Sequence, residues 1–373
     1  MKNKKLLFFC PDFHPRNTGY SNAFKNLISA LSDYSEYSID ILTDVPLNGA
    51  KELEIDKVKV IRMEKVSKIK GLRFVLNQRE VSKKIEMLNT LNSYDAVMME
   101  TFEYSLVPLF LSKSTLNKFV IRIHACYETE RRFFYPGLLN LVNRYIVNYV
   151  SKNKLQHIAS TNQYHIGFAK EHFLKSNLYD ICQKNFYLVP NTIEVKDDFC
   201  FESEDQVKLK VLTLGRMDES GKLQKGFSDL LCSLYLCKED IQDKISFTLI
   251  GKGKYLNAYK NFIQDQNLSF IEVIEYEEHA TLLNRLKRND VVILPSRYEG
   301  MSMFALEALA TSNSVIFTET GGLVDLCSDG NNGYLVKPQS IEDLSKAIAK
   351  LCGHEKQTIH RMKAHSRELF NSS

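Results

Sequence analysis

The stretch that decides the fold is DVVILPSRYEGMSMFALEALA, residues 290–310. It opens with a short apolar run that ends at Pro295, and this is typical of a buried strand. The second apolar run, MFALEALA, predicts a helix over 302–311. Two glutamates lie eight positions apart, with Glu299 in the connecting loop and Glu307 about one turn inside the helix. A carboxylate in an apolar helix requires a polar partner, because burying it unpaired is costly.

The 373 residues are 44% hydrophobic and 25% charged, which is ordinary globular composition. This length predicts two domains. No stretch reaches the roughly 18 consecutive apolar residues of a membrane span, and we interpret the short N-terminal apolar run as a first strand rather than a signal peptide. The eight cysteines form no C-x-x-C pair and no cluster with histidines. That pattern favours reduced thiols in a cytoplasmic protein and predicts no metal site.

Short apolar runs alternate with amphipathic stretches along the whole chain, for example KKLLFFC, YSIDILT and KFVIRIH, then LKVLTLG, KISFTLIG and SVIFTE. Such alternation predicts parallel βαβ units. An acidic, aperiodic stretch, NTIEVKDDFCFESEDQVK, lies between the two series. We therefore predict one α/β domain over 1–192, a second over 193–353 and a helical tail over 354–373 that packs back on the first. Ligands of open α/β sheets bind beyond the carboxyl ends of the strands.

Cations and glycines follow two predicted strands of the second half. The strand LKVLTLG ends in Gly215-Arg216, and Lys225 stands at the start of the next helix, past a polar loop. Two cations beside a helix N-terminus form an anion site, although solvated surface cations are the alternative. Gly251 follows the next strand, where a glycine permits close approach to a ligand or simply a tight turn.

The helix that contains Glu307 contributes to the same volume. Its first N–H groups, near 301–303, are predicted to point toward Arg216 and Lys225. The two hydroxyls of a ribose diol would satisfy Glu307 with hydrogen bonds.

Five segments, in this order, are FYLVPNTIE, GRMDESGKLQKG, LIGKGKYLNAYKNFI, VVILPSRYEGMSMFALEALA and GGLVDLCSDGNNGYLV. Together they resemble the retaining glycosyltransferases of family 4, and they cover about residues 186–351. The resemblance implies an α/β structure of the GT-B fold, in which two Rossmann-like βαβ domains face each other across a central cleft. Two glutamates eight apart are unspecific by themselves, and the strand–loop–helix context and the order of the motifs carry the likeness.

The resemblance also implies roles for individual residues. Glu299 would bind hydroxyls of the donor sugar, and Glu307 would bind the nucleotide ribose. Arg216 and Lys225 would hold the diphosphate. Backbone N–H groups of the following loop would help to bind phosphate or sugar: Gly300, Met301, Ser302 and Met303.

The remaining assignments are looser. Tyr276 follows a strand that ends near the base in this family. In the first domain, Gly19 would bring backbone close to the phosphates or the acceptor, and this chain has one glycine where many members have two. His124 matches a histidine beside the donor sugar, with a hydrogen-bonded core histidine as the alternative. A polar loop with Glu128, Glu130, Arg131 and Arg132 would line the acceptor side or is simply solvated.

The implied reaction transfers a sugar from a UDP- or GDP-sugar, with retention, to a hydroxyl of a glycan or lipid-linked acceptor. Protein cations would stabilise the leaving diphosphate, so that no metal and no cofactor beyond the donor is expected. The Lys- and Asn-rich composition suggests bacterial surface polysaccharide synthesis, such as capsule, O-antigen or lipopolysaccharide. Two alternatives stay open: a nucleotide-sugar epimerase or hydrolase of the same architecture, and a catalytically silent nucleotide-sugar binding protein.

Charge is unevenly distributed between the two halves. Residues 1–195 contain 27 Lys and Arg against 19 Asp and Glu, and the remainder contains 22 against 26. Seven of the basic residues and a single glutamate lie between Lys65 and Lys84. We interpret this segment as a patch for an anionic membrane surface, with a solvated helix as the alternative. The protein would then lie at the inner face of the cytoplasmic membrane, and no nucleic-acid partner is expected.

Overall fold

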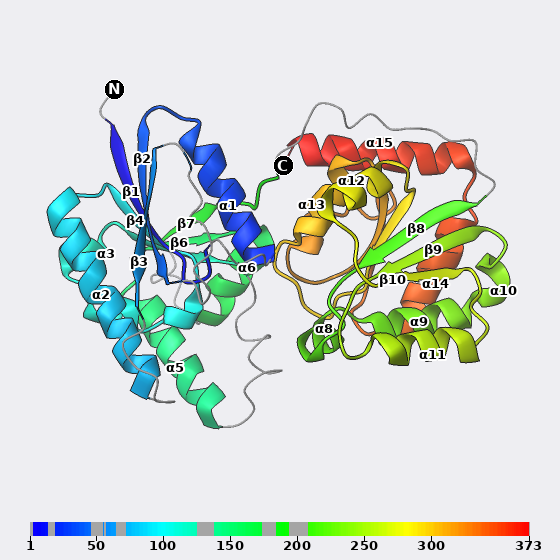
Figure 1. Ribbon diagram of the computed structural model, residues 1–373, viewed down its shortest axis with the longest axis horizontal. Helices are drawn as coiled ribbons and strands as arrows, with labels where there is room; N and C mark the ends of the chain where they lie inside the picture. Colours follow the sequence, from blue (N-terminus) through cyan, green and yellow to red (C-terminus); the bar gives the residue numbers. More distant parts are fainter. Residues whose placement is uncertain are drawn as a thin grey trace. The chain divides into compact units, whose positions relative to one another are not determined.

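The computed structural model describes residues 3–13, 19–45, 55, 57–64, 72–124, 138–173, 184–193 and 208–372. The chain divides into two compact units, Met1–Thr192 and Ile193–Ser373. Each unit is built on its own sheet (Figure 1).

The described residues of the first unit form a seven-stranded sheet in the order β3-β2-β1-β4-β5-β6-β7. Every neighbouring pair is parallel. The strands are β1 (Lys4–Phe9), β2 (Tyr37–Asp44), β3 (Val58–Met63), β4 (Ala96–Met99), β5 (Phe119–Ile123), β6 (His157–Ser160) and β7 (Asn185–Leu188). The helices are α1 (Gly19–Ser32), α2 (Leu72–Asn92), α3 (Lys113–Leu116), α5 (Leu138–Asn153) and α6 (Gln163–Phe168).

Alternate residues of β1 supply two separate cores, because successive side chains of a strand point to opposite faces of the sheet. Leu7 and Phe9 pack in a cluster with residues of α2 and α5. Phe8 and Cys10 pack in a second cluster with residues of α1. Helices therefore cover both faces of this sheet, as a fully buried parallel sheet requires.

The described residues of the second unit form a six-stranded parallel sheet in the order β10-β9-β8-β11-β12-β13. Its strands are β8 (Leu209–Leu214), β9 (Ile245–Ile250), β10 (Ile271–Ile274), β11 (Val291–Leu294), β12 (Ser314–Thr318) and β13 (Gly333–Val336). The helices are α8 (Glu219–Gln224), α9 (Phe227–Leu236), α10 (Lys238–Ile241), α11 (Leu256–Asp265), α12 (His279–Lys287), α13 (Met303–Ala310), α14 (Ile341–Cys352) and α15 (Lys356–Ser372).

Two apolar clusters also lie on opposite faces of this sheet. Residues of α9, α11 and α14 form one, and residues of α12 and α13 form the other (Figure 1). In both units the first strand lies in the middle of the sheet and the strand order reverses beside it. The reversal falls between β8 and β11 in the second unit, and between β1 and β4 in the first. Such switch points are where open α/β sheets bind ligands.

The C-terminal helix α15 makes its described contacts within the second unit. Ile359 and Met362 are buried in the cluster that contains α9 and α14. Lys363 donates to the Asn289 carbonyl at 2.7 Å and to Asp290 at 2.9 Å. The apolar face of the helix is therefore buried in the second unit, and the expectation that residues 354–373 pack on the first domain stays a prediction.

Two further sequence expectations need correction or restriction. The polar loop expected between Arg216 and Lys225 contains the short helix α8, which begins at the N-cap Asp218. Of the basic patch Lys65–Lys84, residues 65–71 lie outside the described residues, and the rest belongs to α2. Among the described helices, none is long and apolar enough to cross a bilayer.

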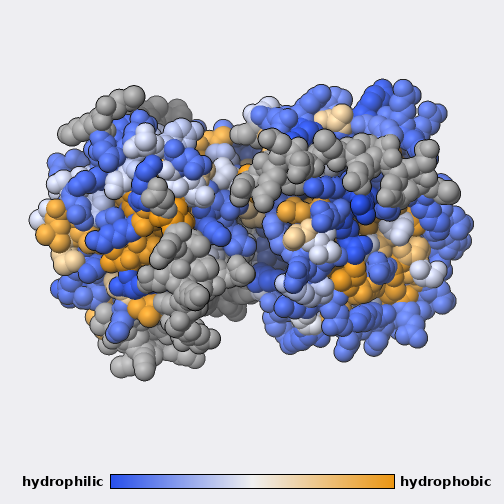
Figure 2. Space-filling model, turned by 45° about the horizontal axis from the view of Figure 1, so that its top comes forward, coloured by the Kyte–Doolittle hydropathy of each residue, from blue (hydrophilic) through white to orange (hydrophobic). Residues whose placement is uncertain are grey.

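Hydrophilic residues cover much of the face seen in Figure 2, and apolar areas interrupt it in each unit. Exposed apolar side chains on α5 include Leu141, Tyr145 and Tyr149, which lie one helical turn apart.

Candidate functional site

The loop after β8 brings Arg216 and Lys225 together through one glutamine. Arg216 Nη2 donates to Gln224 Oε1 at 3.1 Å. Gly215 leaves room for the lysine chain, because a Cβ at this position would lie 3.0 Å from Lys225 Cγ and 2.9 Å from the ring of Phe227. The glycine that precedes Arg216 is therefore required by packing at the strand end.

Glu299 lies at the other end of the same network, in the loop after β11. Its Oε2 accepts from Lys225 Nζ at 2.7 Å and from Ser296 Oγ at 3.1 Å. Its Oε1 accepts from Gln224 Nε2 at 3.4 Å. The side chains of Lys225 and Glu299 keep 15% and 10% of their surface exposed. Both ions are thus largely desolvated and paired, yet remain reachable from solvent.

The backbone of this loop is fixed by a second set of contacts. Arg297 forms a forked ion pair with Asp229 of α9, at 2.8 and 2.9 Å. Gly321 has a φ of +53°, and a Cβ there would lie 1.8 Å from the carbonyl oxygen of Glu299. The next residue, Gly322, donates to the Gly300 carbonyl at 2.6 Å. The GG pair after β12 therefore supports the loop that carries Glu299 at close range.

Three of the predicted binding residues also have structural roles. Ser302 is the N-cap of α13, and its hydroxyl accepts from Ala305 N at 3.3 Å. Met301 is buried and belongs to the apolar cluster on that face of the sheet, and Met303 packs against the same cluster. The Met301 side chain thus packs in the core, and the expected role of its backbone N–H group stays a prediction.

Glu307 is paired rather than free. Its Oε1 lies 2.8 Å from His279 Nε2, the first residue of α12. The hydrogen bond that Glu307 accepts raises the pKa of His279 above its ordinary value. The glutamate side chain is 12% exposed and the histidine 67%. The polar partner that the sequence required for Glu307 is thus an exposed side chain that a ligand could replace.

The two other predicted residues of this unit follow β9 and β10. A Cβ on Gly251 would lie 2.1 Å from the Gly215 carbonyl oxygen, so this glycine permits the two strand ends to approach each other. Tyr276 is 66% exposed, and Lys252 Nζ lies 4.9 Å from its ring centroid. An exposed ring beside a cation is suited to stacking on a planar base.

In the first unit, Gly19 begins α1, and no described residue would lie within 4 Å of a Cβ at this position. His124 directly follows β5, and its Nε2 lies 2.6 Å from Glu100 Oε2. Glu100 directly follows β4 and also accepts from Arg122 Nη1 at 3.0 Å. Neither Glu100 nor Arg122 was predicted from the sequence. A signal was present, because Arg122 interrupts the apolar strand KFVIRIH and Glu100 ends the strand of YDAVMME.

Several expectations lie outside what the structure describes. The polar loop with Glu128, Glu130, Arg131 and Arg132 falls within 125–137, which is not described. Among the described residues, no three His, Cys, Asp or Glu side chains gather in a way that could hold a metal ion. Metal independence stays a prediction.

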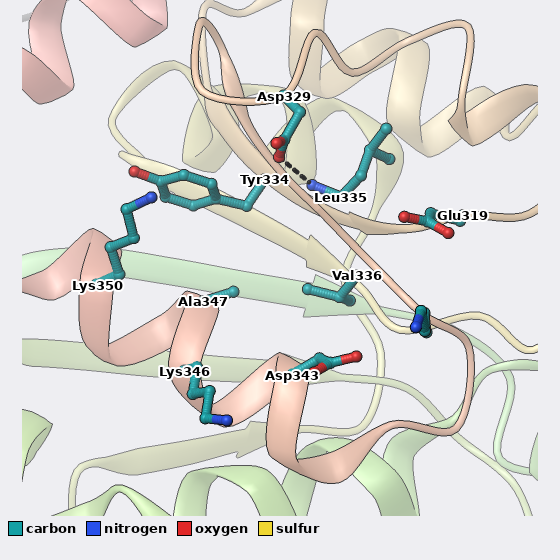
Figure 3. Close-up of a pocket in the computed structure, with 10 residues that line it drawn as sticks. Glu319, Asp329, Tyr334, Leu335, Val336, Asp343, Lys346, Ala347 and Lys350 are labelled. Atoms are coloured by element: carbon teal, nitrogen blue, oxygen red, sulfur yellow. Dashed lines mark hydrogen bonds between the residues drawn. The ribbon is translucent and has the colours of Figure 1, made fainter.

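A separate hollow of about 290 Å³ lies between β13 and α14 (Figure 3). Its charged groups are largely engaged: Asp329 accepts from Leu335 N, Lys350 lies over the ring of Tyr334, and Lys346 pairs with Glu342. It shares no residue with the network around Glu299.

Comparison with known proteins shows which families and folds the chain resembles. Residues 198–369 match the family model described as "Glycosyl transferases group 1". An uncharacterized glycosyltransferase of Methanocaldococcus jannaschii is 23% identical over 346 residues, which are 92% of this chain and 87% of that protein. The UDP-Gal:alpha-D-GlcNAc-diphosphoundecaprenol alpha-1,3-galactosyltransferase of Escherichia coli is 25% identical over 187 residues, 46% of this chain and 48% of that enzyme.

A solved structure is similar over both units. The sucrose-phosphate synthase of Thermosynechococcus elongatus matches with a TM-score of 0.75 at 14% identity, covering 99% of this chain and 94% of that one. The predicted GT-B fold is thereby confirmed. Residues 198–369 thus resemble the group 1 glycosyltransferases, and the chain as a whole has the GT-B fold.

Proposed function

We propose that this protein is a retaining glycosyltransferase of family 4 that transfers a sugar from a UDP- or GDP-sugar to a hydroxyl of a glycan or lipid-linked acceptor. The observation that carries the proposal is the network of Arg216, Gln224, Lys225 and Glu299. It joins the loops after β8 and β11, which flank the switch point of the second sheet. Cations for a diphosphate and a carboxylate for sugar hydroxyls thus stand side by side.

Cleavage of the bond between sugar and diphosphate leaves negative charge on the phosphates. Arg216 and Lys225 would stabilise that charge, and the N-terminus of α13 would add the N–H groups of its first turn. Before a donor binds, the charge of Lys225 is balanced by Glu299. A bound diphosphate would compete with Glu299 for Lys225. Glu299 would then be able to accept hydrogen bonds from the sugar hydroxyls.

We treat Glu299 as a binding and orienting residue rather than a nucleophile. Its two oxygens already accept from three donors of the protein, a setting that lowers the nucleophilicity of a carboxylate. The acceptor hydroxyl would then attack on the face that the diphosphate leaves, and the leaving phosphate would take its proton. Glu307 would exchange His279 for the ribose hydroxyls.

The acceptor and the cellular place belong to the same proposal. The galactosyltransferase of Escherichia coli cited above is named for a diphosphoundecaprenol-linked acceptor, and we propose an acceptor of this lipid-linked type in surface polysaccharide synthesis. Lys65–Lys84 would dock the cytoplasmic protein on anionic lipid. Sedimentation with anionic liposomes tests this: binding should fall at high salt, and absence of binding at low salt would refute it.

The donor is tested by a thermal-shift panel of UDP- and GDP-sugars. A true donor at 100 times its Kd stabilises the protein by about 2.7 kcal/mol. For the donor so found, Glu299→Gln, Arg216→Ala and Lys225→Ala should each lower turnover by about 100-fold or more. Lys346→Ala is the matched control, because this exposed lysine pairs with Glu342 of its own helix, α14. Near wild-type turnover in all three site variants would refute the assignment.

Product analysis separates the alternatives. An epimerase or hydrolase would consume the donor without any acceptor. A silent binding protein would bind nucleotide tightly and show no turnover over a broad panel of glycan and lipid-linked acceptors.

A further inference from the structure

A cluster of buried polar side chains lies at the carboxyl edge of the first sheet. Glu100 and Arg122 have fully buried side chains, and His124 keeps 14% of its side chain exposed. The three residues come from the ends of the neighbouring strands β4 and β5. Buried charges of this kind are costly unless each is paired and hydrogen-bonded.

All three nitrogens of the Arg122 guanidinium donate hydrogen bonds. Nη1 donates to Glu100 at 3.0 Å, and Nε and Nη2 donate to the Val189 carbonyl at 3.0 and 2.9 Å. Nη2 also donates to the Pro190 carbonyl and to Asn191 Oδ1, at 3.0 and 3.2 Å. An arginine fixed in this way is a permanent positive charge beside Glu100.

This charge determines the ionisation of both neighbours. Burial by itself raises the pKa of Glu100, but Arg122 and the bond from His124 outweigh it, and the pKa of the carboxyl is lowered. Burial and then Arg122 lower the pKa of His124, against the opposite effect of Glu100. Near neutral pH the pair is therefore an ionised carboxylate and an uncharged imidazole.

An ionised carboxylate has only acceptor atoms, so the 2.6 Å contact requires that His124 Nε2 carries the proton and donates it. The other ring nitrogen, Nδ1, is then an acceptor, and no described residue donates to it. Tyr20 holds the ring from a second side, with its ring edge-on at 4.9 Å and its hydroxyl donating to the Glu100 carbonyl at 2.8 Å.

We propose that Glu100 is a positioning residue that holds His124 as its Nε2–H tautomer, so that Nδ1 accepts a hydrogen bond from a sugar hydroxyl. Glu100 cannot touch the ligand itself, because its side chain is fully buried. It acts through the ring, as a carboxylate behind a functional histidine does in other sites. The hydrogen bond to a sugar hydroxyl rests on the proposed transferase function, whereas the assignment of the tautomer is independent of that function.

The surroundings of the ring contain two buried polar atoms without a hydrogen-bond partner in the described residues: Glu100 Oε1 and His165 Nε2. Burial lowers the pKa of His165 to about 4, and the charge of His124 contributes to the same shift. Among the described residues, the titratable or charged groups near His124 are Glu100, Arg122, Tyr20 and His165, with Cys10 behind Tyr20. Protonation of His124 at neutral pH is opposed by burial and by Arg122, whereas His165 is uncharged there.

The tautomer is tested on the wild-type protein by nitrogen NMR of labelled histidines, with His124 assigned from a His124→Gln sample. The expected result is a neutral ring with an unprotonated Nδ1 at pH 7, unchanged to below about pH 6.5, the ordinary pKa of histidine. A ring protonated at Nδ1, or charged at pH 7, would overturn the proposal without bearing on the transferase function.

Two variants test the role of Glu100. Glu100→Met removes the acceptor and should mix the tautomers and lower kcat/KM by about tenfold or more. Glu100→Gln should retain the tautomer, because Arg122 only donates and so fixes the amide oxygen at the position of Oε2. It should retain most of the activity and move the acidic limb of the pH profile to lower pH, since the carboxylate no longer raises the pKa of His124.

The control is Glu86→Gln in the same unit, whose carboxylate accepts from Ser112 N and Thr115 Oγ1. Its pH profile should match the wild type. If Glu100→Met does not fold, the proposal is tested by the wild-type NMR spectrum and by the acidic limb of the pH profile of Glu100→Gln. An acidic limb at the wild-type pH would refute the proposal. Donor turnover that is absent in the wild type, with the Nε2–H tautomer present, would refute the transferase function alone.

Discussion

The support that Gly321 gives to the Glu299 loop can be tested with a pair of glycine substitutions. Gly321 and Gly330 both have positive φ, +53° and +78°. An alanine at either position is therefore strained by about 1–3 kcal/mol. Of the two, Gly321 is the one where the new Cβ meets backbone, 1.8 Å from the Glu299 carbonyl oxygen; at Gly330 nothing lies within 4 Å.

The difference between the two variants follows from this contact. The Glu299 carbonyl has to retreat by about 1 Å before Gly321→Ala can be accommodated, and such overpacking costs a further ~1–3 kcal/mol. The carboxylate of Glu299 moves with its backbone. A displacement of about 1 Å at a reacting centre lowers turnover by about 100-fold.

We expect Gly330→Ala to lower the thermal midpoint and to leave turnover of the donor and the Kd of UDP near wild type. Gly321→Ala should lower the midpoint more, and turnover by about 100-fold. Calorimetry gives both the midpoint and the UDP affinity, and nucleotide release gives turnover. Equal midpoints and equal turnover in the two variants would refute the reasoning.

Three further outcomes follow from single contacts. His279→Ala should flatten the pH dependence of UDP binding between about pH 6 and 8. In the wild type the protonated histidine, whose pKa is raised, competes with the ligand for Glu307, and this competition weakens as the ring loses its proton at higher pH. Identical pH profiles of the two proteins would contradict this. In the folded protein the pKa of His165 is depressed to about 4, so the free energy of unfolding of the first unit should fall by up to about 3 kcal/mol as pH falls from about 6.5 to 4. Urea unfolding of His165→Gln should show a smaller decrease over the same pH range. Lys363→Met should destabilise the second unit by about 1–3 kcal/mol, since Asp290 and a carbonyl lose their donor; an unchanged urea midpoint would show that this contact does not hold α15.

Much of the second unit was predictable from the sequence, because its signals are local. The apolar run before Pro295 and the helix that begins at Met303 appear as expected, as β11 and α13. Gly215 and Arg216 follow β8, as the end of the apolar run indicates. The helix α8 was missed, because its six residues, ESGKLQ, are polar and too few to show a helical period.

The contacts within the candidate sites were harder to predict from the sequence. His279 lies 28 residues before Glu307, and Gly321 lies 22 residues after Glu299. No periodicity links such positions. The contact of α15 with the second sheet was out of reach for the same reason: an amphipathic helix shows that one face is buried, and the sequence does not say against which sheet.

The sequence by itself determined the alternation of strands and helices, the parallel sheets, and the residue types that stand at each strand end. These follow from burial patterns with periods of about two and 3.6 residues, which each segment carries alone. Only the tertiary structure decided that Lys225 pairs with Glu299, and that Glu100 contacts both Arg122 and His124. Those pairings depend on strand order and on the approach of loops far apart in the chain, and charge states depend on the burial that results.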